Sequence, residues 1–172
     1  MNRFNIGDTI IYPNQGLGVI EEIQEETYFG QDLRIYHVRL IACNTLVLVP
    51  SSNADEIGIR KPISEEMVEK IYIFMEKGEV DVTMNWKGRY KKHQDLMRTG
   101  TLLDVAHVLK SLFYLNLIKP LSFREKKMME KAMELISAEV SEVSSMPLQA
   151  IEDRLVETLS SCYKDVTVRA DS

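Results

Sequence analysis

The sequence predicts an α+β protein in which a small antiparallel β-barrel-like domain is followed by a compact helical bundle. The first sixty residues contain short apolar stretches separated by turn residues, which is the pattern of β-strands. After Pro62 the apolar residues recur instead with helical spacing. With 172 residues, 45% of them hydrophobic and 27% charged, the chain can bury a substantial core.

The first domain, residues 1–62, is predicted to contain four strands, at 9–12, 18–23, 35–41 and 45–49. Turn residues between the strands favour antiparallel hairpins, and a strongly bent sheet or partly open barrel follows. Gly16 and Gly18 are interpreted as turn and bulge glycines, because no helix follows them to hold a phosphate. Cys43 and Cys162 are predicted to be small buried residues, since they lack paired spacing.

Residues 63–82 predict a helix and a linker, and residues 83–165 a second, helical domain. Capping residues predict the helix starts. They are Ser64, Asn85, a Thr101–Asp104 capping box, a Ser122–Glu125 capping box and Pro147. Apolar residues then form the inner faces of the helices. The sequence predicts as inner residues Met67, Ile71, Phe74 or Met75, Leu102, Val105, Leu109, Leu112, Met128 or Met129, Ala132, Ile136, Leu148, Ile151, Leu155, Leu159 and Cys162.

Charge is distributed unevenly along the chain. The net charge is −5, yet residues 83–131 contain 11 basic and 4 acidic residues, a local charge of +7. Such a segment can attract a polyanion although the whole molecule is acidic. The alternative is an ordinary solvated helix face.

No constellation typical of an enzyme is present. The three histidines are isolated, and no paired-cysteine, phosphate-loop or nucleophile-elbow motif occurs. We therefore expect no catalysis, no metal and no cofactor. Met128, Met129 and Met133 could form a soft binding patch, but core packing explains them better. The absence of a long apolar segment or signal peptide predicts a cytoplasmic protein with no membrane contact.

The single tryptophan, Trp86, lies at the start of the basic segment. If Asn85 is the N-cap, Trp86 is the first helical residue and its indole can project into solvent. Free backbone N–H groups and the helix dipole there favour a phosphate. Nearby charge comes from Lys87, Arg89, Lys91 and Lys92. Together these features predict a docking point for a nucleic-acid backbone, with the indole as an apolar wedge in a minor groove.

The competing interpretation is that Trp86, Tyr90, His93 and Met97 form one buried helix face. Spacing alone does not decide between the two. Gly88 favours a binding role for this helix. Glycine inside a helix costs about 1 kcal/mol relative to alanine, and it leaves room for a partner close to the backbone.

Five motifs resemble the CarD/CdnL family of bacterial transcription regulators. They are residues 4–16 (FNIGDTIIYPNQG), Val49-Pro50, Ile57-Gly58-Ile59-Arg60, Asn85-Trp86-x-x-Arg89-Tyr90-Lys91 and Leu121-Ser122-x-x-Glu125-Lys126-Lys127-Met128. The resemblance runs in order from about residue 4 to residue 140, and the combination is more specific than any one motif.

The resemblance implies a Tudor-like (SH3-like) N-terminal domain that binds the RNA polymerase β subunit. It also implies a helical domain that contacts promoter DNA at the upstream edge of the melted region, with Trp86 as the wedge that stabilises the open complex. Lys91, Lys126 and Lys127 match DNA-contacting positions, and Leu48, Pro50 and nearby Val38 lie where the family meets polymerase. We expect a monomer.

The sequence also departs from the family pattern. Gly88 stands where relatives often carry Arg, Leu48 stands where some carry a polymerase-contacting Arg, and residues 113–116 replace a commonly basic stretch. These departures predict weaker DNA affinity. Binding to polymerase would then keep the local concentration of the protein at the DNA high.

The function hypothesis is therefore a non-enzymatic transcription regulator whose DNA-binding residues include Trp86, Lys87, Arg89, Tyr90 and Lys91. Recruitment is expected by pairing of an exposed sheet edge with polymerase. The alternative is a protein–protein adaptor whose helices do not touch DNA.

Overall fold

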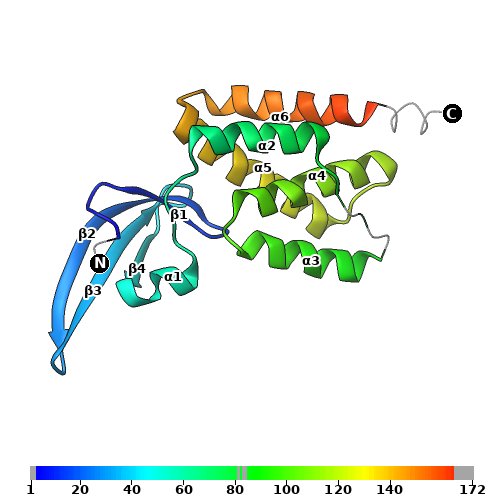
Figure 1. The fold of residues 1–172 in the computed structure, drawn as a ribbon. Helices are drawn as coiled ribbons and strands as arrows, with labels where there is room; N and C mark the ends of the chain where they lie inside the picture. The colour runs from blue at the N-terminus through cyan, green and yellow to red at the C-terminus, as the bar shows by residue number, and fades with distance from the viewer. Residues whose placement is uncertain (1–2, 81, 83–84, 165–172) are drawn as a thin grey trace. The chain divides into compact units, whose positions relative to one another are not determined.

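The computed structural model describes residues 3–80, 82 and 85–164, apart from the side chain of Trp86. The chain divides into two compact units, a β unit (Met1–Pro62) and a helical unit (Ile63–Ser172), drawn in Figure 1. Each has its own apolar core. The predicted α+β class is confirmed.

The β unit is a curled antiparallel half-barrel. Its strands, in the order β1-β2-β3-β4, are β1 (Thr9–Tyr12), β2 (Gly16–Tyr28), β3 (Gln31–Leu40) and β4 (Leu46–Pro50). A 3-10 turn, η1 (Ser51–Asn53), and a short helix, α1 (Ala54–Ile57), follow. The outer edge of β1 is bridged by Arg60, which exchanges two backbone hydrogen bonds with Ile11 of 2.7 and 3.2 Å.

Two features bend β2 around the core of the β unit. A Cβ on Gly18 would lie 2.7 Å from Val38 Cγ1, so only glycine lets these strands approach closely. A register shift between Ile20 and Glu22 is a bulge, which increases the local twist. The concave face packs apolar residues, and the rings of Phe4 and Tyr36 meet edge to face with centroids 5.6 Å apart.

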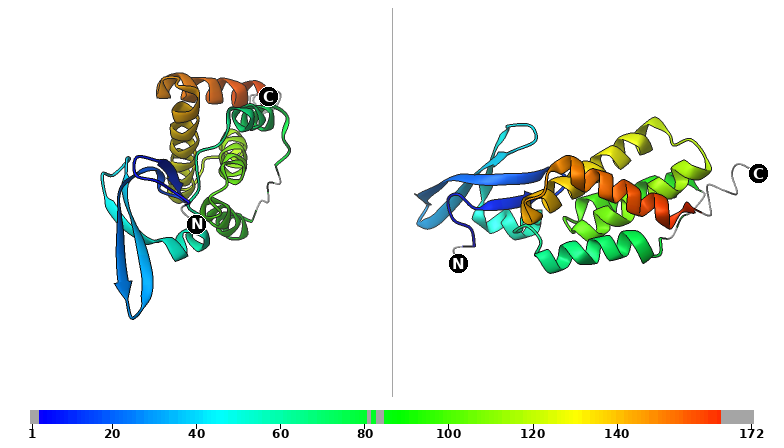
Figure 2. Two further views of the ribbon diagram at one scale, coloured as in Figure 1. Left: turned by 60° about the vertical axis from the view of Figure 1, so that its left-hand side comes forward. Right: turned by 90° about the horizontal axis from the view of Figure 1, so that it is seen from above.

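The β2 and β3 strands are longer than the sequence predicted. Both continue past Ile23 and Ile35 into a two-stranded arm that projects beyond the rest of the sheet (Figure 2). Apart from Tyr28 and Leu33 its strand residues are polar, so no hydrophobic alternation indicated a strand. The prediction that Cys43 is buried is wrong, because Cys43 is exposed in the turn before β4.

The helical unit contains five helices within the described residues. They are α2 (Glu65–Lys77), α3 (Trp86–Arg98), α4 (Leu102–Ile118), α5 (Phe123–Ser144) and α6 (Leu148–Cys162). The most deeply buried is α4, which places Val105, Leu109 and Leu112 in the core. Val68, Ile71 and Met75 of α2 belong to the same core, so α2 is an integral part of this unit and not of a linker.

Local chemistry explains most of the helix ends. The side chains of Ser64, Asn85 and Ser122 accept a backbone N–H of the first turn, as predicted. Thr101 precedes α4, but its hydroxyl makes no capping bond, so the predicted Thr101–Asp104 box is wrong. Leu148 is another correction: it begins α6 on the exposed side, outside the core.

Among the described residues, no helix has the length and apolar character needed to cross a membrane.

Candidate functional site

The start of α3 places Trp86 where the sequence predicted it. Asn85 has an extended backbone and its side-chain oxygen accepts the N–H of Lys87 at 3.2 Å, so Trp86 is the first helical residue. The indole lies outside the described part of the chain. Its exposure, and its action as a wedge, stay predictions.

The outward face of α3 is basic. Lys87, Lys91 and Lys92 are all exposed there, within about one and a half helical turns. Gly88 lies between them, and a Cβ built on it would have no atom within 4 Å. A shallow hollow is lined by Gly88, Lys91, Lys92, Asp95, Leu96 and Thr99. A partner can therefore come close to the α3 backbone between two ammonium groups.

On the inward face of α3 lies Arg89, whose predicted contact with DNA is wrong. Arg89 is buried, with 3% of its side chain exposed, so it does not belong to the predicted DNA-contacting surface. Its Nε and Nη2 donate to Glu125 Oε1 of α5, at 2.8 and 2.6 Å. A buried guanidinium needs such a partner because desolvation of an isolated charge is very unfavourable.

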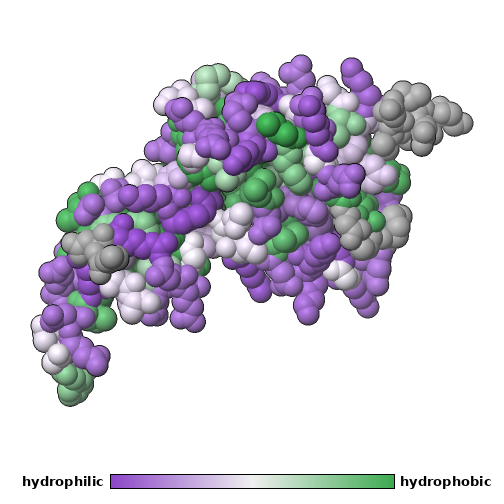
Figure 3. Space-filling model, in the orientation of Figure 1, coloured by the Kyte–Doolittle hydropathy of each residue, from purple (hydrophilic) through white to green (hydrophobic). Residues whose placement is uncertain are grey.

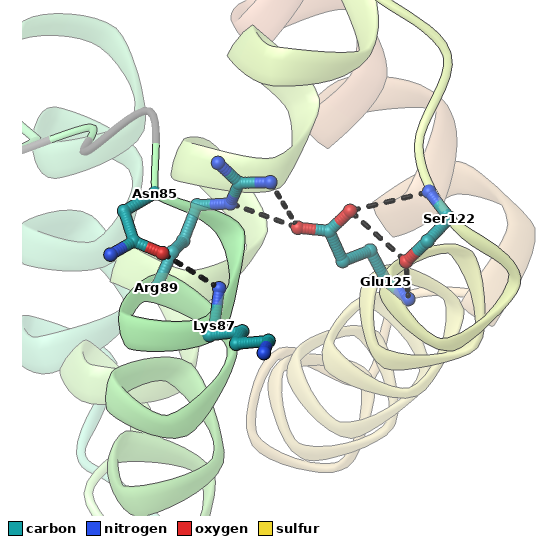
Figure 4. A network of polar contacts seen from close by, with 5 residues as sticks. All are labelled: Asn85, Lys87, Arg89, Ser122 and Glu125. Atoms are coloured by element: carbon teal, nitrogen blue, oxygen red, sulfur yellow. Dashed lines mark hydrogen bonds and ion pairs between the residues drawn. The ribbon is translucent and has the colours of Figure 1, made fainter.

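Glu125 connects this ion pair to the start of α5 (Figure 4). Its Oε2 accepts the backbone N–H and the hydroxyl of Ser122, at 3.2 and 3.1 Å, which completes the predicted capping box. Burial by itself would raise the pKa of Glu125, but hydrogen bonds from Arg89 and Ser122 outweigh it and hold that pKa below its ordinary value. The first turns of α3 and α5 are thereby fixed side by side.

The first turns of α5 add a second group of cations. Lys126 and Lys127 are exposed, and Lys127 pairs with Glu130 at 2.9 Å. Sequence reasoning did not single out Arg124 and Phe123, which are exposed in the same turn; the ammonium of Lys127 lies 5.7 Å from the Phe123 ring centroid. The signal was available, because residues directly after an N-cap have few neighbours within their own helix.

The predicted alternative of a buried α3 face is correct in part. His93 and Met97 are buried, and Tyr90 is half-buried. Burial, with smaller effects from His107 and Arg89, lowers the pKa of His93 from 6.5 to about 4, so the ring is neutral near pH 7. The true inward face is Arg89, His93 and Met97, at intervals of four residues.

Not every cation of the basic segment reaches the surface. Lys110 of α4 is buried, and its Nζ donates to the carbonyl of Phe74 at 2.9 Å. Burial lowers the pKa of Lys110, although the nearby Cys162 acts in the opposite direction. The ammonium also lies over the rings of Phe74 and Tyr163. Lys110 and Arg89 are therefore structural, and the surface charge of the segment is smaller than its composition indicates.

The β unit offers a different kind of site, an open sheet edge. In the described residues β4 pairs only with β3, so its other edge can accept a strand. Leu46 and Leu48 alternate outward from this strand and are 41% and 55% exposed, and Pro50, on the same face, is half-buried. The predicted polymerase contact Val38 is wrong, because its side chain is fully buried in the core opposite Val47.

These two surfaces, an open sheet edge on the β unit and a basic face on the helical unit, are of the kind found in the class of proteins that bind macromolecular partners. No group of metal-ligating side chains occurs in the part of the chain that the structure describes.

Family comparisons agree with this class. The model "CarD-like/TRCF RID domain" matches residues 4–63, and the model "CarD, C-terminal domain" matches residues 70–156. A relative in Bacillus subtilis (strain 168), described as "Putative transcription factor YdeB", is 32% identical over 151 residues, which cover 87% of this chain and 97% of the relative. The chain belongs to the CarD-like family of transcription regulators, whose members are not enzymes. The RID match indicates interaction with RNA polymerase.

Proposed function

We propose that this protein binds the RNA polymerase β subunit through its β unit and promoter DNA through its helical unit, and thereby stabilises the open complex. The main support for the proposed DNA binding is the buried Arg89–Glu125 ion pair. It joins two segments 36 residues apart, so that exposed cations of α3 and α5 belong to one rigid part of the molecule. These cations are Lys87, Lys91, Lys92, Arg124, Lys126 and Lys127.

DNA recognition is then mostly electrostatic. Ammonium and guanidinium groups of α3 and α5 contact backbone phosphates, which position the protein but read little sequence. The indole of Trp86, at the tip of α3, enters the minor groove and unstacks a base step at a cost of a few kcal/mol, which the phosphate contacts offset. DNA that is already partly open needs less unstacking. The protein accordingly favours distorted duplex over regular duplex.

Polymerase recruitment uses the free edge of β4. A strand of the β subunit adds to this edge through main-chain hydrogen bonds, and Leu46 and Leu48 provide apolar contact beside it. Attachment to polymerase raises the local protein concentration at the promoter. A modest intrinsic affinity for DNA is then sufficient.

The test compares DNA binding with and without RNA polymerase. Wild type and Trp86→Ala are titrated onto a promoter duplex with a central bubble and onto the fully paired duplex, with polymerase-dependent footprinting in parallel. Removing the stacking of one aromatic ring on a base costs about 1 to 3 kcal/mol, so the variant should bind the bubble roughly 5- to 150-fold more weakly while remaining folded. Lys91→Glu should lower the slope of the salt dependence by about 1 or more, because a side chain that no longer meets a phosphate releases no counterion there.

Lys77→Glu is the matched control, since it makes the same charge change on an exposed lysine of α2, away from α3. If Lys77→Glu and Lys91→Glu weaken binding equally, the effect comes from net charge and the proposed surface is wrong. Unchanged promoter occupancy on adding polymerase would refute recruitment. A protein that binds polymerase but neither duplex would be an adaptor.

A further inference from the structure

The arm formed by β2 and β3 ends in an aromatic pair that the function described above does not use. Beyond the Ile35–Pro50 pair, only β2 and β3 continue, and they close in a two-residue turn, Phe29-Gly30. Four further residues of β3 separate that pair from the turn. At about 3.4 Å per residue, the turn lies roughly 14 Å past the end of β4.

Phe29 and Tyr28 at this turn are exposed and stabilise no core. The side chain of Phe29 is 91% exposed and that of Tyr28 is 66% exposed. Their rings meet edge to face, with centroids 4.6 Å apart. Figure 3 shows the result as an apolar tip at the end of a hydrophilic arm. An exposed aromatic pair of this kind is a typical anchor for a protein partner.

The backbone conformation at Phe29 is one that disfavours phenylalanine. Phe29 has a φ of 50° and Gly30 has a φ of 74°, so both turn residues adopt the left-handed region. Two-residue hairpin turns of this type strongly favour Asn-Gly, and a bulky aromatic at the first position is strained. Residues held in such conformations without structural benefit are found at functional sites.

The charges around the tip indicate the chemistry of its partner. Glu26 and Asp32 flank the aromatic pair, whereas Glu25 forms an ion pair with Arg34 at 3.4 Å, so the arm is acidic on balance. An acidic arm repels nucleic acid and attracts a basic protein surface. The matching site is therefore an apolar pocket with lysine or arginine side chains at its rim.

We propose that the Tyr28–Phe29 tip is a second docking element for RNA polymerase, inserted into such a basic-rimmed apolar pocket. The partner is the same polymerase that adds a strand to β4, and to that extent the inference rests on the proposed function. Continuity supports this choice, because a partner strand that runs along β4 past Pro50 continues alongside the arm. Two contacts on one unit also orient the protein on polymerase, which a single paired strand does only weakly.

The test uses Phe29→Asn in the full chain, with affinity for a bacterial RNA polymerase core enzyme measured in the absence of DNA. Asn tolerates the left-handed conformation, so the melting temperature should rise by a few degrees. Polymerase affinity should nevertheless fall about tenfold or more. A purely structural role would make stability and binding change in the same direction.

Phe123→Asn is the matched control, because it replaces another exposed phenylalanine, on the helical unit, with the same residue. It should leave polymerase affinity unchanged. Glu26→Lys should weaken binding, and more so at low salt, if the pocket rim is basic. A lower melting temperature for Phe29→Asn, or unchanged affinity, would overturn the proposal.

Leu48→Glu separates this inference from the proposed function. If Leu48→Glu weakens polymerase binding and Phe29→Asn does not, the tip has no docking role and β4 recruitment stands. If neither variant weakens binding, recruitment through the β unit fails, and the inference fails with it.

Discussion

The two faces of α3 carry similar residues with opposite roles. On the inward face, Arg89 is buried in an ion pair with Glu125 and holds the helix against α5. On the outward face, Lys91 is exposed and available to a polyanion. The two residues are close neighbours in the basic segment, yet one determines stability and the other surface charge. Positive charge in a sequence therefore identifies a binding surface only after burial has been established.

The largest expected effect comes from breaking the inward contact. Arg89→Ala leaves Glu125 buried without its partner, and removal of one member of a buried pair costs about 3 to 5 kcal/mol. Lys91→Ala, on the outward face, should change stability by no more than about 0.5 kcal/mol. Urea denaturation of the three proteins measures the difference directly.

A double variant serves as the control for this prediction. Arg89→Met with Glu125→Gln removes both charges, while Gln can still accept the N–H of Ser122. It should be clearly more stable than Arg89→Ala. If Arg89→Ala costs less than about 1 kcal/mol, the ion pair does not hold α3 in place.

His93, on the same inward face, predicts a smaller and pH-dependent effect. Its pKa in the folded protein is about 4, below the value of 6.5 that applies when it is exposed. Protonation therefore favours the unfolded chain, so its stabilising contribution is complete above pH 6.5 and is lost as the pH falls towards 4. Between pH 7 and pH 5 the loss is about 2 kcal/mol.

The comparison with His93→Leu isolates this contribution from other titrating groups. Unfolding free energies measured between about pH 5 and pH 7 should fall more steeply for wild type than for the variant. This window lies above the range in which Glu125, whose pKa is lowered, loses its own contribution. Parallel pH profiles would mean that His93 is solvated in the folded protein.

The smallest expected effect is at Gly88, on the outward face. A methyl group there meets no atom within 4 Å, so Gly88→Ala should stabilise the protein by up to about 1 kcal/mol. Gly78→Ala is the contrasting variant, because its Cβ would overlap the Phe74 ring and should destabilise the fold. Thermal unfolding of both tests whether the α3 surface around Gly88 is open.

Features set by neighbouring residues could be predicted from the sequence. Asn85 and Ser122 cap α3 and α5 because their side chains reach backbone N–H groups two or three residues away. Prediction failed at Thr101, whose hydroxyl makes no such bond, and at the polar arm, where both faces of the hairpin are solvated. Neither case carries a hydrophobic signal that would reveal the outcome.

The site was harder to predict than the fold. Lys87, Lys91, Lys126 and Lys127 are exposed, as contact with DNA would require, but Arg89, expected beside them, is buried. The predicted polymerase contact at Val38 was also wrong, for a simpler reason. The alternation that makes Leu48 exposed on β4 turns Val38 of β3 into the core, and the register between the strands cannot be read from either one alone.

The sequence by itself determined the order of strands and helices, most helix starts and the position of Trp86 at the tip of α3, because capping and periodicity act over a few residues. Only the tertiary structure decided which cations face outward. Arg89 is buried because Glu125, 36 residues later, compensates its charge, and the buried ammonium of Lys110 donates a hydrogen bond to the Phe74 carbonyl. The free energy of a charge depends on partners that folding brings together from distant parts of the chain.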